Sequence, residues 1–171
     1  MDLAGKAMEI VSGKTARRLL YEDLFLPLGL TDDIPMGDFG AGLRPTAREL
    51  GVLAQVLANR GRYGDLELFS EDTFKQMLPE DLGQRYPGVK EEYGLALGWK
   101  PELKPDAPPF SKNPADMILS PRTIGHGSLS QCILRVDLER DLIIVQIRRQ
   151  AGPHFDQWAP RFFQVIVDEM L

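Results

Sequence analysis

His126 lies between two glycines in the run Gly125-His126-Gly127-Ser128, directly ahead of an apolar stretch over residues 130–137. An imidazole titrates near neutral pH, so it can hold a hydroxyl or polarise a carbonyl without carrying a permanent charge. The flanking glycines have no Cβ and let another backbone or a ligand approach closely. The pattern predicts a histidine that lines a site at the start of a strand. The alternative is an ordinary strand-edge histidine.

A nucleophile to accompany this histidine is not evident. No serine in the chain has a lysine three positions later, so no hydroxyl has an amine placed to activate it in this way. Ser111-Lys112-Asn113 matches Ser-x-Asn, but it lies in a proline-rich segment close before His126, and we interpret the match as coincidence. Ser12-Gly13-Lys14-Thr15 imitates the end of a phosphate-binding loop, but Met8 stands where that motif needs its first glycine.

The composition narrows the class of protein. The 171 residues are 43% hydrophobic and 26% charged, as in an ordinary globular domain. A net charge of −5 with scattered basic residues argues against a nucleic-acid partner. No run approaches the ~18 apolar residues of a membrane span. The first residues lack the pattern of a signal peptide, and the compartment stays open.

Cysteine and histidine usage predicts neither a disulfide nor a metal site. Cys132 is the only cysteine, and we interpret it as a small buried side chain rather than a nucleophile. The two histidines, His126 and His154, are far apart and lack ligand spacing, so we expect no metal and no other cofactor. We expect His154, which follows Gly152-Pro153, to lie in a turn or at a helix start.

Helices dominate the first half of the predicted elements. Residues 2–30 form two helices separated at Ser12-Gly13, and the first has an apolar face of Leu3, Ala7, Ile10 and Val11. A capping box, Thr46-Ala47-Arg48-Glu49, opens a helix that runs to about residue 58. Ser70 caps another short helix.

Strands dominate the second half. We expect strands over residues 93–99, 130–137 and 141–148, the last two forming a hairpin. Residues 100–121 contain six prolines and are expected to be irregular. A final helix at about 156–171 has an apolar face of Trp158, Phe162, Val165, Ile166 and Met170.

These elements predict a single partial domain over residues 1–171. Residues 1–92 are its mostly helical portion, and residues 93–171 contain the strands and the C-terminal helix. A hairpin plus one strand makes a thin sheet with edges that need cover. We therefore expect a missing N-terminal segment upstream of Met1, or pairing with a second copy in a homodimer.

The order of five short motifs resembles the β-lactamase-related serine hydrolase family, which includes class C β-lactamases, DD-carboxypeptidases and family VIII esterases. The resemblance covers nearly the whole chain. The motifs are Phe39-Gly40-Ala41-Gly42-Leu43-Arg44-Pro45-Thr46-Ala47-Arg48-Glu49-Leu50, Gly61-Arg62-Tyr63-Gly64, Leu68-Phe69-Ser70-Glu71-Asp72-Thr73, Tyr93-Gly94-Leu95-Ala96-Leu97-Gly98-Trp99 and Gly125-His126-Gly127-Ser128.

The resemblance implies an active site built from three motifs. A Ser-x-x-Lys supplies nucleophile and base, a Tyr-x-Asn or Ser-x-Asn assists proton transfer, and a Lys-Thr-Gly or His-x-Gly box on a strand lines the other side. In the family the first two precede the matched segment. Only the third box is present here, with His126 first, Gly127 second and Ser128 where the family usually has glycine. The resemblance implies that the amide of Leu129 helps to form the oxyanion hole.

The resemblance also implies the fold and the reaction. The expected fold is α+β (α/β), an antiparallel sheet flanked by helices, as in the C-terminal portion of a serine β-lactamase-like protein. The expected parent cleaves small esters, peptides or lactams through an acyl-enzyme, with Tyr93 and Trp99 as residues that could line the substrate cleft. Lacking the nucleophile, the chain alone is expected to be inactive. The alternatives are a non-catalytic binding or regulatory module, or one half of a two-chain or strand-exchanged assembly.

Overall fold

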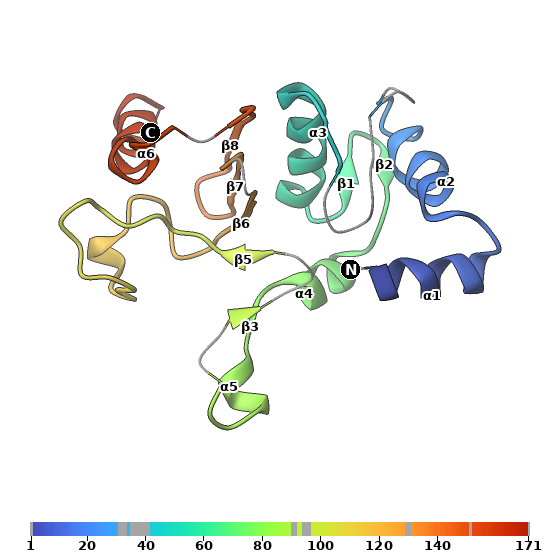
Figure 1. Ribbon diagram of the computed structural model, residues 1–171, viewed down its shortest axis with the longest axis horizontal. Coiled ribbons are helices and arrows are strands. Elements are labelled where there is room, and N and C mark those ends of the chain that lie inside the picture. Colours follow the sequence, from blue (N-terminus) through green and yellow to red (C-terminus); the bar gives the residue numbers. More distant parts are fainter. Residues whose placement is uncertain are drawn as a thin grey trace.

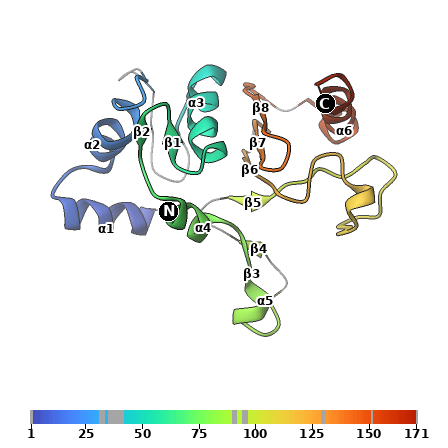
Figure 2. The ribbon, with the colours of Figure 1, turned by 180° about the vertical axis from the view of Figure 1, so that it is seen from behind.

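Three layers stand side by side in the computed structural model, which describes residues 2–30, 34, 42–89, 92–93, 97–128, 131–150 and 152–170. Helix α6 (Phe155–Met170) covers one face of a central antiparallel sheet, and α3 (Ala47–Ala58) lies on the opposite face (Figure 1). The view from behind shows the same order, with α1 (Asp2–Ser12) and α2 (Ala16–Leu20) beyond α3 (Figure 2). The predicted α+β class is confirmed.

The central sheet has four strands in chain order: β5 (Gly98–Trp99), β6 (Thr123–Gly127), β7 (Ile133–Asp137) and β8 (Leu142–Gln146). All neighbouring strands run antiparallel. The predicted hairpin is confirmed as β7 and β8: β7 begins later than expected and ends at Asp137 as predicted, and β8 is shorter at both ends.

The residue pattern did not predict β6 and placed the histidine box ahead of a strand, whereas the family resemblance implied a box on a strand. Glycine-rich runs have low β propensity, so the sequence around His126 resembles a turn. The ladder with β7 overrides that preference, since all five residues of β6 have a partner there. Of the strand expected over 93–99, the described residues fall in β4 (Glu92–Tyr93) and β5, which belong to different sheets, and residues 94–96 lie outside the described part of the chain.

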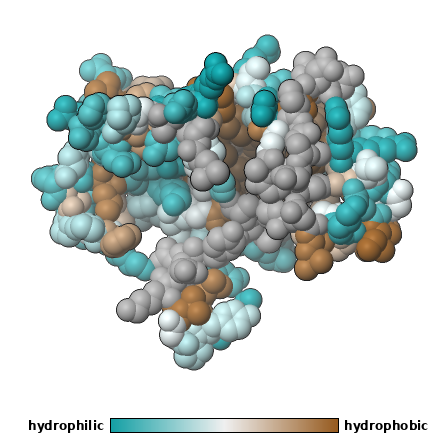
Figure 3. Space-filling view, viewed as in Figure 1, coloured by the Kyte–Doolittle hydropathy of each residue, from teal (hydrophilic) through white to brown (hydrophobic). Residues whose placement is uncertain are grey.

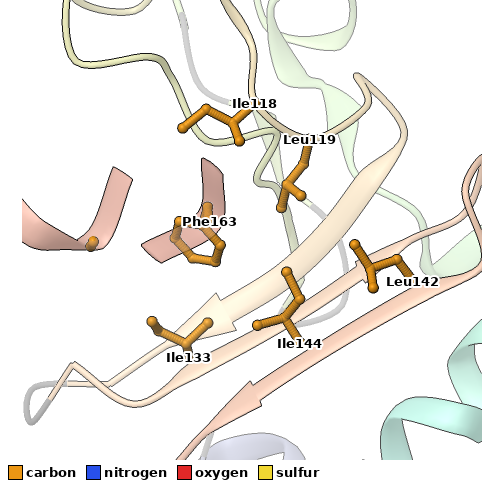
Figure 4. Close-up of a cluster of buried hydrophobic side chains, with 7 residues drawn as sticks. Ile118, Leu119, Ile133, Leu142, Ile144 and Phe163 are labelled. Carbon is orange, nitrogen blue, oxygen red and sulfur yellow. The ribbon is translucent and has the colours of Figure 1, made fainter. Parts of the chain in front are cut away.

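A hydrophobic cluster joins α6 to its face of the sheet (Figure 4). It consists of Ile118, Leu119, Ile133, Leu142, Ile144, Ala159 and Phe163. The helix is rotated relative to its predicted face: Phe163 is only 1% exposed, whereas Val165 and Met170 are 60% and 67% exposed. Trp158, Phe162 and Ile166 contact the rim of the cluster as expected.

A second cluster fills the space between the sheet and α3. Its buried members are Ala54, Phe74, Leu97, Ile124 and Val136. Helix α3 begins where predicted: Thr46 Oγ1 accepts from the amide of Glu49 at 3.2 Å, and the Glu49 carboxylate accepts from the amide of Thr46 at 2.6 Å. This reciprocal cap fixes the start of the helix.

The N-terminal helices separate where glycine was expected to break them. Gly13 has φ +68°, a left-handed conformation that ends α1, and Thr15 then caps α2. A π-helical turn, η1 (Tyr21–Phe25), follows directly. The predicted apolar face of α1 is not buried: Leu3, Ile10 and Val11 are 85%, 81% and 88% exposed.

The middle of the chain forms short elements between the helical and sheet portions. A hairpin of β1 (Arg62–Tyr63) and β2 (Leu66–Glu67) follows α3. Ser70 caps α4 (Glu71–Met77) as predicted, by accepting from the amide of Thr73. Strand β3 (Glu80–Asp81), α5 (Leu82–Arg85) and β4 complete this part.

The proline-rich segment is more ordered than expected. Leu103 and Met117 form an antiparallel bridge, and a 3-10 helix, η2 (Pro114–Asp116), is capped by Asn113. Its end supplies Ile118 and Leu119 to the α6 cluster. Two buried apolar side chains therefore order a segment whose prolines alone indicate an irregular loop.

The outer edge of the sheet is open in the described part of the chain, where β8 has a partner only on its β7 side. No described helix is both long and apolar enough to cross a bilayer.

Candidate functional site

His126 is the fourth residue of β6 and lies opposite Leu134 of β7. Side chains alternate along a strand, so His126 shares the α3 face of the sheet with Ile124, a member of the α3 cluster. Ile124 is fully buried, whereas His126 is exposed. The imidazole therefore lies where the covered part of this face ends, and it is accessible to a ligand.

The neighbouring strand approaches Gly125 closely, as predicted for another backbone, whereas Gly127 has no such close backbone neighbour among the described residues. A Cβ on Gly125 would lie 2.2 Å from the backbone oxygen of Leu134, a distance that atoms do not tolerate. A Cβ on Gly127 would lie 3.8 Å from the backbone oxygen of Cys132, an ordinary contact. The first glycine is therefore required by the sheet itself.

Ser128 shapes the loop that follows β6. Its hydroxyl accepts a hydrogen bond from the amide of Cys132 at 3.1 Å, and its carbonyl accepts from the amide of Gln131 at 2.7 Å. Gln131 adopts a left-handed φ of 57°. Serine in the third box position thus contributes to the turn. Leu129 lies outside the described residues, and its amide role stays a prediction.

The two aromatic residues predicted to line the cleft are in different surroundings. Trp99 faces Ile124 across β5 and β6 and packs on the α3 cluster, with the guanidinium of Arg122 4.7 Å from its ring centre. Tyr93 pairs through its backbone with Glu80 in the separate β3–β4 sheet. Contact of either residue with substrate stays a prediction.

Four residues that were not predicted to act in catalysis have structural roles. Ser111 donates to Asp116 at 2.5 Å and Asn113 caps η2, so this Ser-x-Asn match organises a loop. Cys132 is partly buried. Its thiol donates to the carbonyl of Arg148, and its sulfur accepts from the amide of Arg148. The carbonyl of His154 accepts from the amides of Gln157 and Trp158 at the start of α6, as expected.

Asp137 anchors the end of β7 that lies opposite the start of β6. Burial favours the neutral acid, but hydrogen bonds from the Ser120 hydroxyl, then from the amides of Ser120, Glu139 and Arg140, outweigh it and lower the pKa of Asp137. The carboxylate of Asp137 connects Ser120, in the segment before β6, to the amides of Glu139 and Arg140 in the β7–β8 turn. It therefore fixes the far end of the strand that carries His126.

Arg135, which was not predicted from the sequence, contacts the backbone of the histidine box. Its guanidinium donates to the carbonyl oxygen of His126 at 2.9 Å and pairs with Glu102 at 2.5 Å. An arginine inside an apolar strand was the available signal. Its partner is 33 positions away, and no local pattern connects them.

The chemistry available at this end of β6 is that of the exposed imidazole of His126. An exposed imidazole at the end of a strand can orient a hydroxyl or polarise a carbonyl. No serine of the chain has the lysine spacing that would activate it for attack.

Comparison with known proteins identifies relatives of part of the chain. No family model matches it. A protein of Escherichia coli O157:H7, named a candidate D-alanyl-D-alanine carboxypeptidase, is 28% identical over 114 residues, which are 67% of this chain and 23% of the relative. A protein of the same name from Salmonella gallinarum is 30% identical over 61% of this chain and 22% of its own length. The chain thus matches less than a quarter of these relatives.

Solved structures share the fold. A candidate β-lactamase from Bacteroides dorei has a TM-score of 0.61 at 18% identity, covering 97% of this chain and 55% of its own. A β-lactamase of Mycobacterium bovis has a TM-score of 0.59 at 21% identity, covering 96% and 58%. This fold, the partial sequence relatives and the order of motifs that ends in the histidine box together support a likeness to the β-lactamase-related serine hydrolase family over part of that family's length.

Proposed function

We propose that this chain provides the strand-side wall of a serine hydrolase site that cleaves an ester, peptide or lactam through an acyl-enzyme. His126 orients or polarises substrate, Gly127 and Ser128 shape the wall, and the amide of Leu129 donates to the oxyanion. The observation that carries the proposal is the exposed His126 on β6, at the edge of a sheet face whose other residues pack on the α3 cluster and are buried or partly buried.

The proposal assigns attack to a group that this sequence does not supply. A serine hydroxyl needs a nearby base to act as a nucleophile, and the residues here contain no Ser-x-x-Lys. Without a nucleophile to form the acyl-enzyme, a histidine and an oxyanion donor alone leave most of the activation barrier to hydrolysis in place.

We therefore predict that the purified chain does not turn over substrate. Nitrocefin and p-nitrophenyl butyrate should be hydrolysed no faster by the chain than by its H126A variant, and a fluorophosphonate probe should label no serine by mass spectrometry. Turnover that disappears together with probe labelling of one serine would refute this assignment.

A second candidate function is one half of a two-chain or strand-exchanged assembly. The unpartnered edge of β8 and the exposed apolar face of α1, both within the described residues, favour it. A sheet edge of this kind can accept a further strand. Size-exclusion chromatography with light scattering separates the candidates, since a stable dimer supports strand exchange and a compact monomer argues against it.

A further inference from the structure

Arg135 links three parts of the fold at the back of the histidine box. It lies directly opposite Gly125 across the β6–β7 ladder, on the α6 face, with its guanidinium carbon 5.8 Å from the centre of the Phe163 ring. The side chain of His126 is on the other face. Any effect of Arg135 on His126 must therefore pass through the backbone.

The hydrogen bonds of Arg135 provide that connection. Its Nη1 donates to the carbonyl of His126 at 2.9 Å and to that of Leu134 at 2.8 Å, the two residues that face each other across the strands. Nε donates to Glu102 at 2.6 Å. One guanidinium thus connects the end of the β6–β7 ladder to Glu102, a residue of the proline-rich segment.

The ion pair is shielded, unlike most others in the described structure. The side chains of Arg135 and Glu102 are 11% and 22% exposed, whereas the comparable Arg62–Glu67 pair is 63% and 51% exposed. Desolvation offsets much of the attraction within a shielded pair, but removing one partner leaves the other charge without compensation.

Two backbone features allow this contact. A Cβ on Gly125 would also lie 3.0 Å from Cδ of Arg135, so the glycine leaves room for the arginine stem. Glu102 has a left-handed φ of 51°, a conformation that is unfavourable for a residue other than glycine and persists only where the surroundings hold it. Its backbone is held by the amide of Ile118, which donates to the Glu102 carbonyl at 2.7 Å.

From this geometry we infer that Arg135, held by Glu102, is a positioning residue for the His126–Ser128 box. It fixes the His126 carbonyl from the back of the sheet and so sets the direction in which β6 presents its imidazole and the amides that follow. This inference rests on the proposed function for its catalytic meaning, but the positioning itself can be measured without turnover.

The test is NMR of the isotope-labelled full chain. In R135M the 13C shift of the His126 carbonyl should change, and amide exchange of Gly127 and Ser128 should accelerate about tenfold, the loss of one charge-assisted hydrogen bond. Exchange at Ile133 and Ile144 should change less than twofold. R135K should reproduce the loss at His126, because an ammonium cannot bridge the carbonyl and Glu102 as a guanidinium does. The matched control R62Q removes an exposed pair and should leave every signal of the box in place.

Two results would overturn the inference. One is an unchanged His126 carbonyl in R135M and R135K. The other is exchange that rises equally at the box and at Ile133 and Ile144, which is the signature of a purely structural residue. If R135M fails to fold, E102Q and R135K decide by the same criteria. Serine-dependent hydrolysis by the chain would refute the proposed function and leave these NMR results untouched, so the two failures are distinguishable.

Discussion

Single residues at the two ends of β6 set how the strand is held. At its start, Thr123 pairs with Asp137, a buried carboxylate with four hydrogen-bond donors. Toward its end, Gly125 admits the guanidinium of Arg135 to the carbonyl of His126. Neither of these two contacts covers the imidazole of His126, which is exposed.

Replacing Asp137 should remove a pH-dependent part of the stability. The lowered pKa of Asp137 means that its stabilisation is fully present above the unfolded value of about 3.9 and is lost as pH falls through the folded value. D137N should lower the free energy of unfolding by about 2–4 kcal/mol at pH 7. Urea titrations at pH 7 and below pH 4 measure both, and the deficit of D137N should shrink in acid. A deficit that stays constant with pH would contradict the assignment.

At the scale of elements, two opposite packings hold the sheet. Helix α6 contributes Phe163 to one face, and α3 contributes Ala54 to the other. The reciprocal cap formed by Thr46 and Glu49 fixes where α3 begins.

F163A should be among the most destabilising single changes in the chain. Phe163 is 1% exposed within the α6 cluster, and truncating such a side chain leaves a cavity that costs about 3–5 kcal/mol. V165A, on the exposed side of the same helix, should cost no more than about 0.5 kcal/mol. Chemical denaturation of both variants gives the comparison, and equal losses would show that α6 packs by its other face.

Local sequence signals predicted where helices begin and end better than they predicted which segments pair or pack with each other. Gly13, the Thr46–Glu49 cap and the Ser70 cap were readable because each acts within four residues. Strand β6 could not be predicted in this way, because its glycines are typical of a turn and the strand is defined only by pairing with β7. The Arg135–Glu102 pair was unreadable for a similar reason, as it joins positions that only the fold brings together.

The same limit applies to the candidate site. The motif that contains His126 was recognised from the sequence, and the strand that carries it emerged only from pairing with β7. The packing face predicted for α6 is rotated from the observed one. Val165 and Phe163 are both apolar, and only contact with the sheet determines which of them is buried.

For the whole molecule, the apolar face of α1 is a surface without a described partner. Figure 3 shows hydrophobic atoms gathered at the lower right edge, over the part that contains α1. Leu3, Ile10 and Val11 are all more than 80% exposed. Apolar side chains grouped on one helix commonly mark an interaction surface.

Changing this face should alter association and not folding. I10Q/V11Q should keep the free energy of unfolding within about 0.5 kcal/mol of the parent chain, because both side chains are already in water. The variant should also bind less of a hydrophobic dye and self-associate less at high concentration by light scattering. A loss of several kcal/mol would mean that the face is buried in the folded chain. The exposed K6Q change on the same helix serves as the control.

The strands of the central sheet pair in the order in which they are synthesised. Each of β6, β7 and β8 finds its partner across a short turn, and α6, which covers them, comes next along the chain. Contacts of such short sequence separation form rapidly. The β6–β8 meander with α6 is therefore the part expected to fold first, and the docking of α3, which is far away along the chain, should set the pace of the remainder.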